Sequence, residues 1–432
     1  MSGALVATAP KVSGAIAPVD ATLGRWTASH PRTGALIWRL DESGPVEISA
    51  FRADVGYAPA STMKIVTAAS ALINLGPEFR FQTRLVAGSA SVRTGSVLRG
   101  PIYVKGYGDP VLSTPNYART YFSGRGGGIQ RLVAPLRKLG IRTIRGPIVA
   151  DESFLSTSRV GPLWNASYVA DSAPLTGLAI NQSWLGDVRD QYVKNPPVAS
   201  ARRIKRSLKA IGIAQKGPLR GGITPSVARP IASVSSPPLR EIVGIMLPAS
   251  DNFIAEILLR DVGAYIAKEG TTEAGAAQTE ATLEALGVLT GAERVVDGSG
   301  LSRFNRLTPT ALVRVLAAAD GDPNWGDPLI RGLARGGEGT LIRRLRDGVV
   351  RRRVRAKTGY ISGVSALAGV VSSQSGARYA FAFLMNDPDI GGAHAVQDEL
   401  VTMLASGSAD GLAGTPATAI GTVTGPAAAP TP

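Results

Sequence analysis

The chain has no cysteine and only two histidines among its 432 residues. Without cysteine there are no disulfides, thiolate metal sites or cysteine nucleophiles. His30 and His394 are isolated, so the sequence offers neither an HExxH zinc motif nor a recognisable Ser-His-Asp triad. Acid-base chemistry is therefore expected to depend on lysine, serine, aspartate or glutamate, with no metal and no cofactor.

Targeting signals and long apolar runs are also lacking. Residues 1–24 lack the basic N-terminal region followed by an apolar segment that is typical of a secretory signal peptide. No apolar run reaches the length of about 18 residues that a transmembrane helix needs. The sequence is compatible with a cytoplasmic protein and with a mature form whose export signal has been removed.

The charge is strongly unbalanced, with a formal net charge of +15. Such a charge favours an anionic partner, and charge alone does not distinguish nucleic acid, an acidic membrane surface and an acidic polymer. The hydrophobic fraction of 44% is high enough for a substantial buried core, which excludes a wholly disordered chain.

The patterning changes along the chain in a way that predicts two structured parts. Residues 34–50 read as a hairpin, and an apolar helix follows from Ser61 to Leu75. Short apolar runs with frequent glycine and proline then predict an inserted α+β domain. Helices and a terminal hairpin over 364–385 complete the chain. The expected division is a flexible segment 1–24, a catalytic domain formed by 25–81 and 237–405, an inserted domain 82–236, and a disordered tail 406–432.

The first motif with chemical meaning is Ser61-Thr62-Met63-Lys64, the only Ser-x-x-Lys in the chain. A separation of three places the hydroxyl and the amine on one helix face, within reach of a hydrogen bond. Lysine has a reference pKa of about 10.4, so Lys64 can act as a base near neutral pH only if burial or a second cation lowers its pKa. The simpler alternative is a capping serine beside a solvated lysine.

Two further motifs follow in order. Ser250-Asp251-Asn252 stands directly before a predicted helix, where the alternative is an ordinary N-cap. Lys357-Thr358-Gly359 enters a predicted strand, where the cation and hydroxyl suit a carboxylate and the glycine would let a substrate backbone lie close. The alternative there is a surface strand entry. The order Ser-x-x-Lys, Ser-Asp-Asn, Lys-Thr-Gly is the pattern of penicillin-binding proteins and serine β-lactamases.

The chain resembles the class C low-molecular-mass penicillin-binding proteins, the D-alanyl-D-alanine carboxypeptidase/endopeptidase family, over roughly residues 25–405. Three stretches besides the motifs carry the resemblance: Gly106–Pro110, Asp297–Ser302 and Gly363–Gly369. It implies an α+β penicillin-binding/serine β-lactamase-like fold, in which helices flank an antiparallel sheet, with an insert between the first two motifs. The family often inserts two extra domains, but the short segment after Asn181 predicts only one here.

The resemblance also implies a role for each motif residue. Ser61 would be the acylated nucleophile and Lys64 its general base, with Ser250 passing the proton to the leaving amine. Asn252 would hold both the substrate and Lys64. The terminal carboxylate would be bound by Lys357, Thr358 and Gly359, with Lys357 also lowering the pKa of Lys64. The backbone N–H groups of Ser61 and Tyr360 would form the oxyanion hole.

The implied substrate is the stem peptide of peptidoglycan, processed outside the cytoplasm, and β-lactams would be covalent inhibitors. Whether carboxypeptidase or endopeptidase activity dominates is left open. The sequence departs from the family at Tyr360, where threonine is usual. Two alternatives remain: a β-lactamase or esterase on the same fold, and a non-catalytic basic protein that binds cell-wall polymer. The arginine-rich segment 343–355 has no aromatic residue for stacking on bases, so nucleic acid is disfavoured as a partner.

Overall fold

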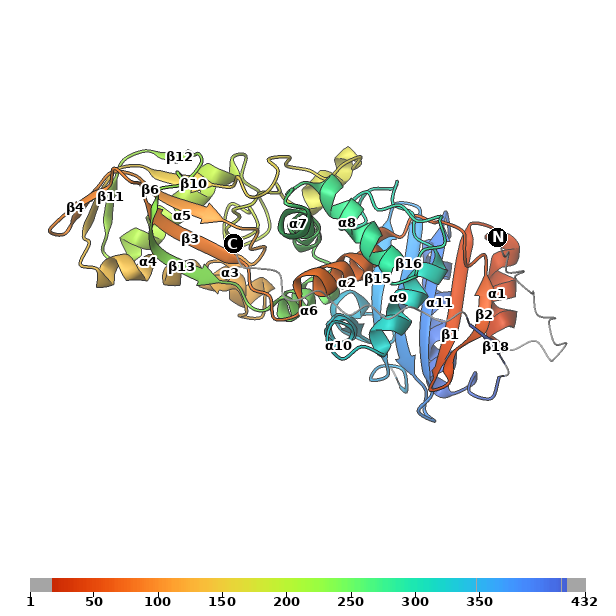
Figure 1. Cartoon of the computed structure of the whole chain (residues 1–432). Coiled ribbons are helices and arrows are strands. Elements are labelled where there is room, and N and C mark those ends of the chain that lie inside the picture. Colours follow the sequence, from red (N-terminus) through yellow and green to blue (C-terminus); the bar gives the residue numbers. More distant parts are fainter. Residues whose placement is uncertain (1–17, 347, 413, 418–432) are drawn as a thin grey trace, which may run out of the picture.

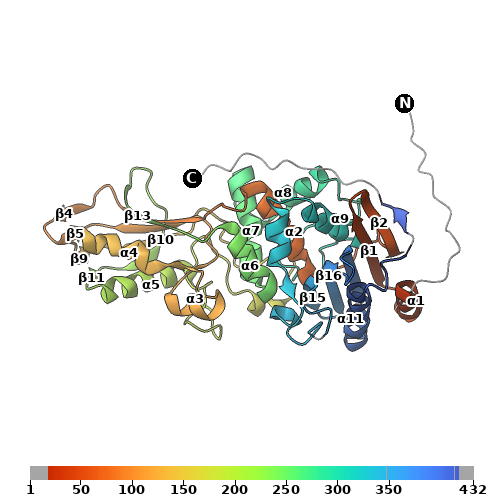
Figure 2. The same cartoon turned by 90° about the horizontal axis from the view of Figure 1, so that it is seen from below.

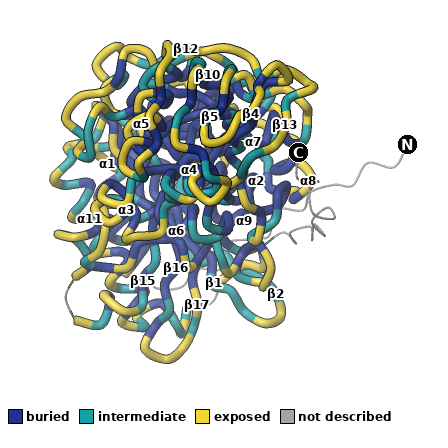
Figure 3. Tube along the Cα trace, turned by 90° about the vertical axis from the view of Figure 1, so that its left-hand side faces the viewer, coloured by how far each residue is buried: buried dark blue, intermediate teal, exposed yellow. Residues whose placement is uncertain are grey.

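A computed structural model describes residues 18–346, 348–412 and 414–417. The molecule is elongated (Figure 1). One end holds a large sheet built from both ends of the chain, the other end holds the smaller sheets of residues 82–235, and a group of helices lies between them (Figures 1 and 2). Seen end-on, the buried segments lie mainly in the interior and the exposed ones mainly at the rim (Figure 3).

The large sheet has seven strands and is antiparallel throughout. The predicted hairpins at both ends of the chain are confirmed, and they pair with each other through β1 and β17. In spatial order the strands are β14 (Ala334–Arg335), β15 (Val354–Ile361), β16 (Val364–Ser372), β17 (Arg378–Asn386), β1 (Thr33–Asp41), β2 (Gly44–Phe51) and β18 (Thr415–Pro416).

Helices cover both faces of this sheet because its central strands are apolar on both sides. Along β17, Phe381 and Phe383 belong to the core under one pair of helices, while Ala382 and Leu384 belong to the core under the other helices. The first pair is α1 (Pro18–Ser29) and α11 (Ile390–Ser406). The second group is α2 (Met63–Leu75), α6 (Leu239–Ala249), α7 (Asn252–Val262), α8 (Thr272–Ala285), α9 (Pro309–Asp320) and α10 (Gly326–Gly332).

Helix α2 lies at the centre of the second group. Every one of its 13 residues is buried, including Lys64. A helix that is buried on all sides must be surrounded by other elements, and α2 is enclosed by α7, α8, α6, α9 and α10. The rigid position of α2 fixes the turn before it, which carries Ser61.

Residues 82–235 form the sheets of the second part. The larger has the order β12-β10-β6-β3-β13, the smaller β11-β9-β5-β4. A single apolar core joins both sheets to α4 (Ile129–Lys138) and α5 (Pro196–Ala210). The strands are β3 (Gln82–Ala87), β4 (Val92–Thr94), β5 (Val97–Arg99), β6 (Ile102–Gly106), β9 (Thr143–Arg145), β10 (Ile148–Asp151), β11 (Ala214–Lys216), β12 (Leu219–Gly221) and β13 (Arg229–Ser235).

Shorter elements connect the two parts. The chain enters the second part on β3 and leaves it on β13, and these strands pair antiparallel, so entry and exit lie side by side. The remaining elements are the strands β7 (Leu112–Ser113) and β8 (Gly127–Gly128), the helix α3 (Pro115–Tyr121), and the short helical turns η1 (Ala60–Thr62), η2 (Ala166–Asp171), η3 (Gly263–Ala267) and η4 (Gly339–Leu341).

The expected boundaries at the chain ends differ from the structure. Residues 1–24 were expected to be flexible, but α1 begins at Pro18 because Val19 and Leu23 bury their side chains against the sheet. Residues 406–432 were expected to form a disordered tail, but Ala409 is fully buried and β18 pairs with β2. Residues 1–17 and 418–432 lie outside the described residues.

Truncation of the chain after Ser406 should lower the free energy of unfolding by about 2 kcal/mol. The segment that is lost holds Asp410, which accepts a hydrogen bond from Tyr379 Oη at 2.8 Å, and the Leu412 carbonyl, which accepts one from Arg39 at 3.0 Å. Urea unfolding measures the change. Truncation after Ala417 is the matched control, and equal stability of the two forms would show that residues 407–417 contribute nothing to the fold.

Candidate active site

Ser61 lies in the turn η1, immediately before α2, and is half-buried. The preceding residue, Ala60, is fully buried and has a positive φ of 47°, which is rare for a residue with a side chain. Two contacts hold this backbone. Thr62 Oγ1 donates to the Pro59 carbonyl at 2.7 Å, and Gly300 packs so closely that a Cβ there would lie 1.8 Å from the Ala60 carbonyl oxygen. Strain of this kind is typical of functional sites.

Lys64 lies one turn into the helix and its ammonium is satisfied on three sides. Nζ donates to Ser61 Oγ at 2.9 Å, to Asn252 Oδ1 at 2.7 Å and to the Ser299 carbonyl at 2.6 Å. An ammonium group has three N–H donors, so each one has an acceptor. The structure thus brings together the first two predicted motifs, and it excludes a solvated Lys64.

Burial lowers the pKa of Lys64 from its usual value to about 8, and the carboxyl groups of Asp297, Glu256 and Asp251 act in the opposite direction. The sequence predicted burial or a second cation as the cause, and burial is the one that operates. Lys357 was expected to help lower the pKa of Lys64. Instead, burial and then the charge of Lys64 hold the pKa of Lys357 well below its usual value.

The second motif occupies the junction between α6 and α7. Ser250 ends α6 in the left-handed conformation with φ 54°. Asp251 is the N-cap of α7 and accepts from the Ile254 N–H at 2.9 Å, so the capping alternative holds for this residue. Asn252 turns toward Lys64 and also donates through Nδ2 to the Asp171 carbonyl at 3.0 Å. The Ser250 hydroxyl makes no hydrogen bond to Ser61 or Lys64 in the described part of the chain.

The third motif lies in the middle of β15 and not at its start, because β15 already begins at Val354. Lys357 is fully buried, and its Nζ donates to the Thr358 carbonyl at 2.8 Å. Thr358 Oγ1 donates to Thr340 Oγ1 at 2.7 Å. Tyr360 is 62% exposed, so its ring points away from the core beside the half-buried Ser61 turn.

Gly359 allows a close approach inside the protein, in addition to the expectation that a substrate backbone lies close to it. A Cβ at Gly359 would lie 2.6 Å from the Pro59 carbonyl oxygen and 3.2 Å from the Thr62 nitrogen. Glycine is therefore required so that β15 can pack directly against the turn that carries Ser61. This close packing brings the third motif to the first.

Comparison with known proteins agrees with this arrangement. Residues 32–190 and 188–406 match the D-Ala-D-Ala carboxypeptidase 3 (S13) family. The chain belongs to this family. It is 31% identical over 411 residues to a carboxypeptidase of Mycobacterium tuberculosis, which covers 90% of this chain and 82% of the relative. It is 29% identical over 427 residues to the D-alanyl-D-alanine carboxypeptidase of Actinomadura sp. (strain R39), covering 80% of this chain and 76% of the relative.

A solved structure shows the same fold. Penicillin binding protein 4 of Haemophilus influenzae superposes with a TM-score of 0.75 at 23% identity, covering 89% of this chain and 99% of that one. The predicted penicillin-binding fold of the α+β class is confirmed. The predicted family is confirmed as well, and the S13 protein is a serine-type D-Ala-D-Ala carboxypeptidase, as its family and relatives are.

Two buried carboxylates of the S13 site had no role in the sequence analysis. Asp297 accepts from the N–H groups of Gly300 at 2.7 Å and Ser302 at 2.6 Å, which holds the loop that closes on the Ser61 turn. Glu256 accepts from the Ser299 N–H at 2.8 Å. The stretch Asp297–Ser302 had been noted only as a family likeness. For Glu256 the available signal was its position four residues after Asn252, on the same helix face.

No group of His, Asp and Glu that could hold a metal ion occurs within residues 18–346, 348–412 and 414–417. The groups around Lys64 Nζ are a carbonyl, an amide and a hydroxyl oxygen, and each accepts a hydrogen bond from the ammonium.

The lowered pKa of Lys64 predicts a specific pH dependence of stability. Between about pH 8 and pH 10.5 the unfolded chain binds a proton at this lysine that the folded chain does not, so stability rises with pH in that window. The free energy of unfolding of the wild type minus that of Lys64→Met should increase by about 2 kcal/mol from pH 8 to pH 10. Urea unfolding at both pH values measures it, and a constant difference would contradict the lowered pKa.

Proposed function

We propose that this S13 carboxypeptidase acts through Ser61 as nucleophile and Lys64 as general base. The observation that carries the assignment is the hydrogen bond of 2.9 Å between Lys64 Nζ and Ser61 Oγ, within a buried site. When Lys64 is neutral, two N–H groups suffice for Asn252 Oδ1 and the Ser299 carbonyl. Both of these partners are acceptors only, so the lone pair of Nζ is directed at the Ser61 hydroxyl.

Acylation follows from this arrangement. Lys64 takes the proton of Ser61 while Oγ attacks the carbonyl carbon of the penultimate D-alanine of a stem peptide. The backbone N–H groups of Ser61 and Tyr360 stabilise the oxyanion, which needs no side chain at position 360. Ser250 passes the proton to the leaving amine, D-alanine departs, and water hydrolyses the Ser61 ester. Asn252 orients Lys64 and holds the substrate amide.

Lys357 is suited to the terminal carboxylate of the substrate. It is buried, and no carboxylate of the described residues forms an ion pair with it. A substrate carboxylate would supply the missing negative charge and restore the pKa of Lys357 toward its usual range. Thr358 adds a hydroxyl donor at the same strand. The binding of the carboxylate thus offsets the cost of burying Lys357, which favours substrates with a free C-terminus.

The substrate class and place of action follow from the family. Peptidoglycan stem peptides outside the cytoplasm fit a basic protein, because the wall polymers around them are anionic. None of the helices in the described ranges has the length and apolar character that crossing a bilayer requires. β-Lactams fit as acylating inhibitors, since a partial relative of Dictyostelium discoideum is named a penicillin-sensitive carboxypeptidase.

Fluorescent penicillin should label the protein covalently, and Ser61→Ala should abolish the label, because no other described hydroxyl accepts a hydrogen bond from Lys64. Gel fluorescence measures the label. Ser43→Ala, in the exposed turn between β1 and β2, is the matched control and should label like the wild type.

Release of D-alanine from a pentapeptide muropeptide should be lost in Ser61→Ala as well. Labelling that persists in Ser61→Ala would overturn the assignment of the nucleophile. Rapid turnover of penicillin would favour a β-lactamase, and labelling without D-alanine release would favour a non-catalytic wall-binding protein.

The rate of acylation should rise with pH through a midpoint near 8, because only neutral Lys64 accepts the proton of Ser61. Asn252→Asp places a carboxylate where Oδ1 now lies, 2.7 Å from Lys64 Nζ, and stabilises the charged lysine. The midpoint should therefore move up by about one pH unit or more. Stopped-flow acylation by penicillin at pH 6 to about 10 measures it.

Asn324→Asp, on an exposed loop, introduces the same charge far from these contacts and should leave the midpoint unchanged. An Asn252→Asp profile that falls in amplitude but keeps its midpoint would contradict Lys64 as the titrating base.

A further inference from the structure

A cavity of about 590 Å³ lies where the second part of the molecule meets α6, and arginines surround it. We refer to it as the arginine cavity. Its lining contains none of the residues of the three catalytic motifs. The charged residues that line it are Arg80, Arg119, Arg125, Arg131 and Glu241.

The arginines of this cavity form no close ion pairs in the described part of the chain. Within residues 18–346, 348–412 and 414–417, no ion pair joins any of the four to a carboxylate. Arg80 donates to the Ser236 carbonyl at 3.0 Å, and Arg119 donates to the Asn116 amide oxygen. Four guanidinium groups line the cavity with the carboxylate of Glu241, and the charge of Arg131 also acts on the pKa of the buried Asp109. An excess of positive charge remains, which an anionic ligand would neutralise.

The backbone beside the arginines adds further donors. Glycines at 124, 126, 127 and 128 line or border the cavity and lead directly into α4. Helix α4 has no side chain capping its N-terminus and no acidic residue in its first turn, where Arg131 stands instead. The helix therefore begins with free N–H groups and a like charge, which an oxyanion would stabilise.

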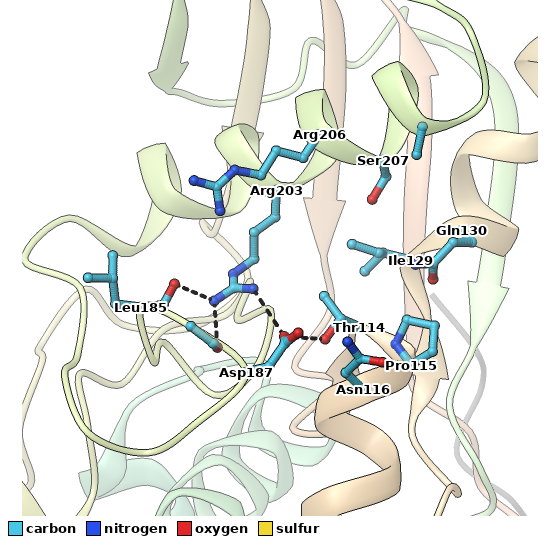
Figure 4. A pocket seen from close by; sticks show the side chains of 12 residues that line it. Thr114, Pro115, Asn116, Ile129, Gln130, Leu185, Asp187, Arg203, Arg206 and Ser207 are labelled. Carbon is cyan, nitrogen blue, oxygen red and sulfur yellow. Dashed lines mark hydrogen bonds and ion pairs between the residues drawn. The ribbon is translucent and has the colours of Figure 1, made fainter.

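A second cavity of about 440 Å³ adjoins the first, since Thr114, Pro115 and Gln130 line both (Figure 4). Two arginines line it, Arg203 and the exposed Arg206. Arg203 is buried, pairs with Asp187 at 4.0 Å, and donates to the Leu185 carbonyl at 2.9 Å (Figure 4). The cavity also presents the Asp187 carboxylate and the hydroxyls of Thr114 and Ser207, which suit a hydroxyl-bearing unit.

We propose that the arginine cavity binds a phosphodiester group of an anionic wall polymer, and that the adjoining cavity takes the neighbouring sugar or polyol unit. One bidentate arginine satisfies a carboxylate, whereas four arginines and a helix N-terminus match the several oxygens of phosphate groups. The site would hold the enzyme on the wall while the catalytic cleft acts on stem peptides. It does not depend on the roles assigned to Ser61 or Lys64.

Titration calorimetry of the full chain with inorganic phosphate, glycerol 3-phosphate and poly(glycerol phosphate) tests the proposal. All three should bind, and the polymer should bind about tenfold more tightly than inorganic phosphate, because it also fills the adjoining cavity. Arg125→Gln combined with Arg131→Gln should weaken polymer binding by about tenfold or more. Penicillin labelling of this variant should be unchanged.

The matched control is Arg99→Gln combined with Arg220→Gln, which removes the same charge from exposed positions outside the cavity. It should change polymer affinity by less than about twofold. Equal losses of polymer affinity in the two double variants would show that only general surface charge matters, and would overturn the proposal. Binding of acetate as tightly as phosphate would also overturn it. If the first variant is less stable by thermal melting, Arg119→Gln alone replaces it, with Arg99→Gln as control.

Discussion

The buried ammonium of Lys64 is the interaction on which the rest of the site depends. An unpaired charge in a protein interior is very costly, so the group remains there only because three acceptors surround it. Those acceptors come from the Ser61 turn, from α7 through Asn252, and from the loop at Ser299. Three segments far apart in the sequence are thus held at one point.

Close packing of two glycines also holds the turn that carries Ser61. Gly300 and Gly359 each allow a backbone to approach the Ser61 turn, one at the Ala60 carbonyl and the other at the Pro59 carbonyl. Glu256 accepts a hydrogen bond from the Ser299 N–H and so holds the loop at Ser299 in place. The Ser299 carbonyl in turn accepts a hydrogen bond from Lys64. Glu256 therefore acts on Lys64 in two ways, through the position of the Ser299 carbonyl and through its own charge, which acts to raise the pKa of Lys64 against the effect of burial.

The sequence was informative where the pattern is local. The hairpins, the apolar helix after Ser61 and the order of the three motifs all follow from spacing and periodicity, and the family likeness predicted that the motifs converge. Contacts between distant segments could not be predicted in this way. The role of Gly359 depends on how closely β15 approaches η1, and the buried position of Ala409 depends on where the chain returns after α11. Neither the approach of β15 to η1 nor the position of Ala409 produces a periodic pattern in the sequence.

The position of the insert explains how a second part can be present without disturbing the catalytic groups. The chain leaves after α2 and returns at α6, so α2 and α7 keep their direct contact through Lys64 and Asn252. The insert nevertheless reaches the site. Arg189 pairs with Asp251 at 2.8 Å, and Gln182 donates to the same carboxylate at 3.0 Å.

Asp251 caps α7 and precedes Asn252, so these contacts hold the start of the helix that orients Lys64. The same cluster extends to α3, because Arg189 also donates to Tyr117 Oη at 2.9 Å. Helix α3 contributes Arg119 to the arginine cavity. One helix of the insert therefore borders an anion-binding surface on one side and supports the capping carboxylate of the catalytic helix on the other. Residues 82–235 are consequently tied to the start of α7, because removing them would leave Asp251 without its cation.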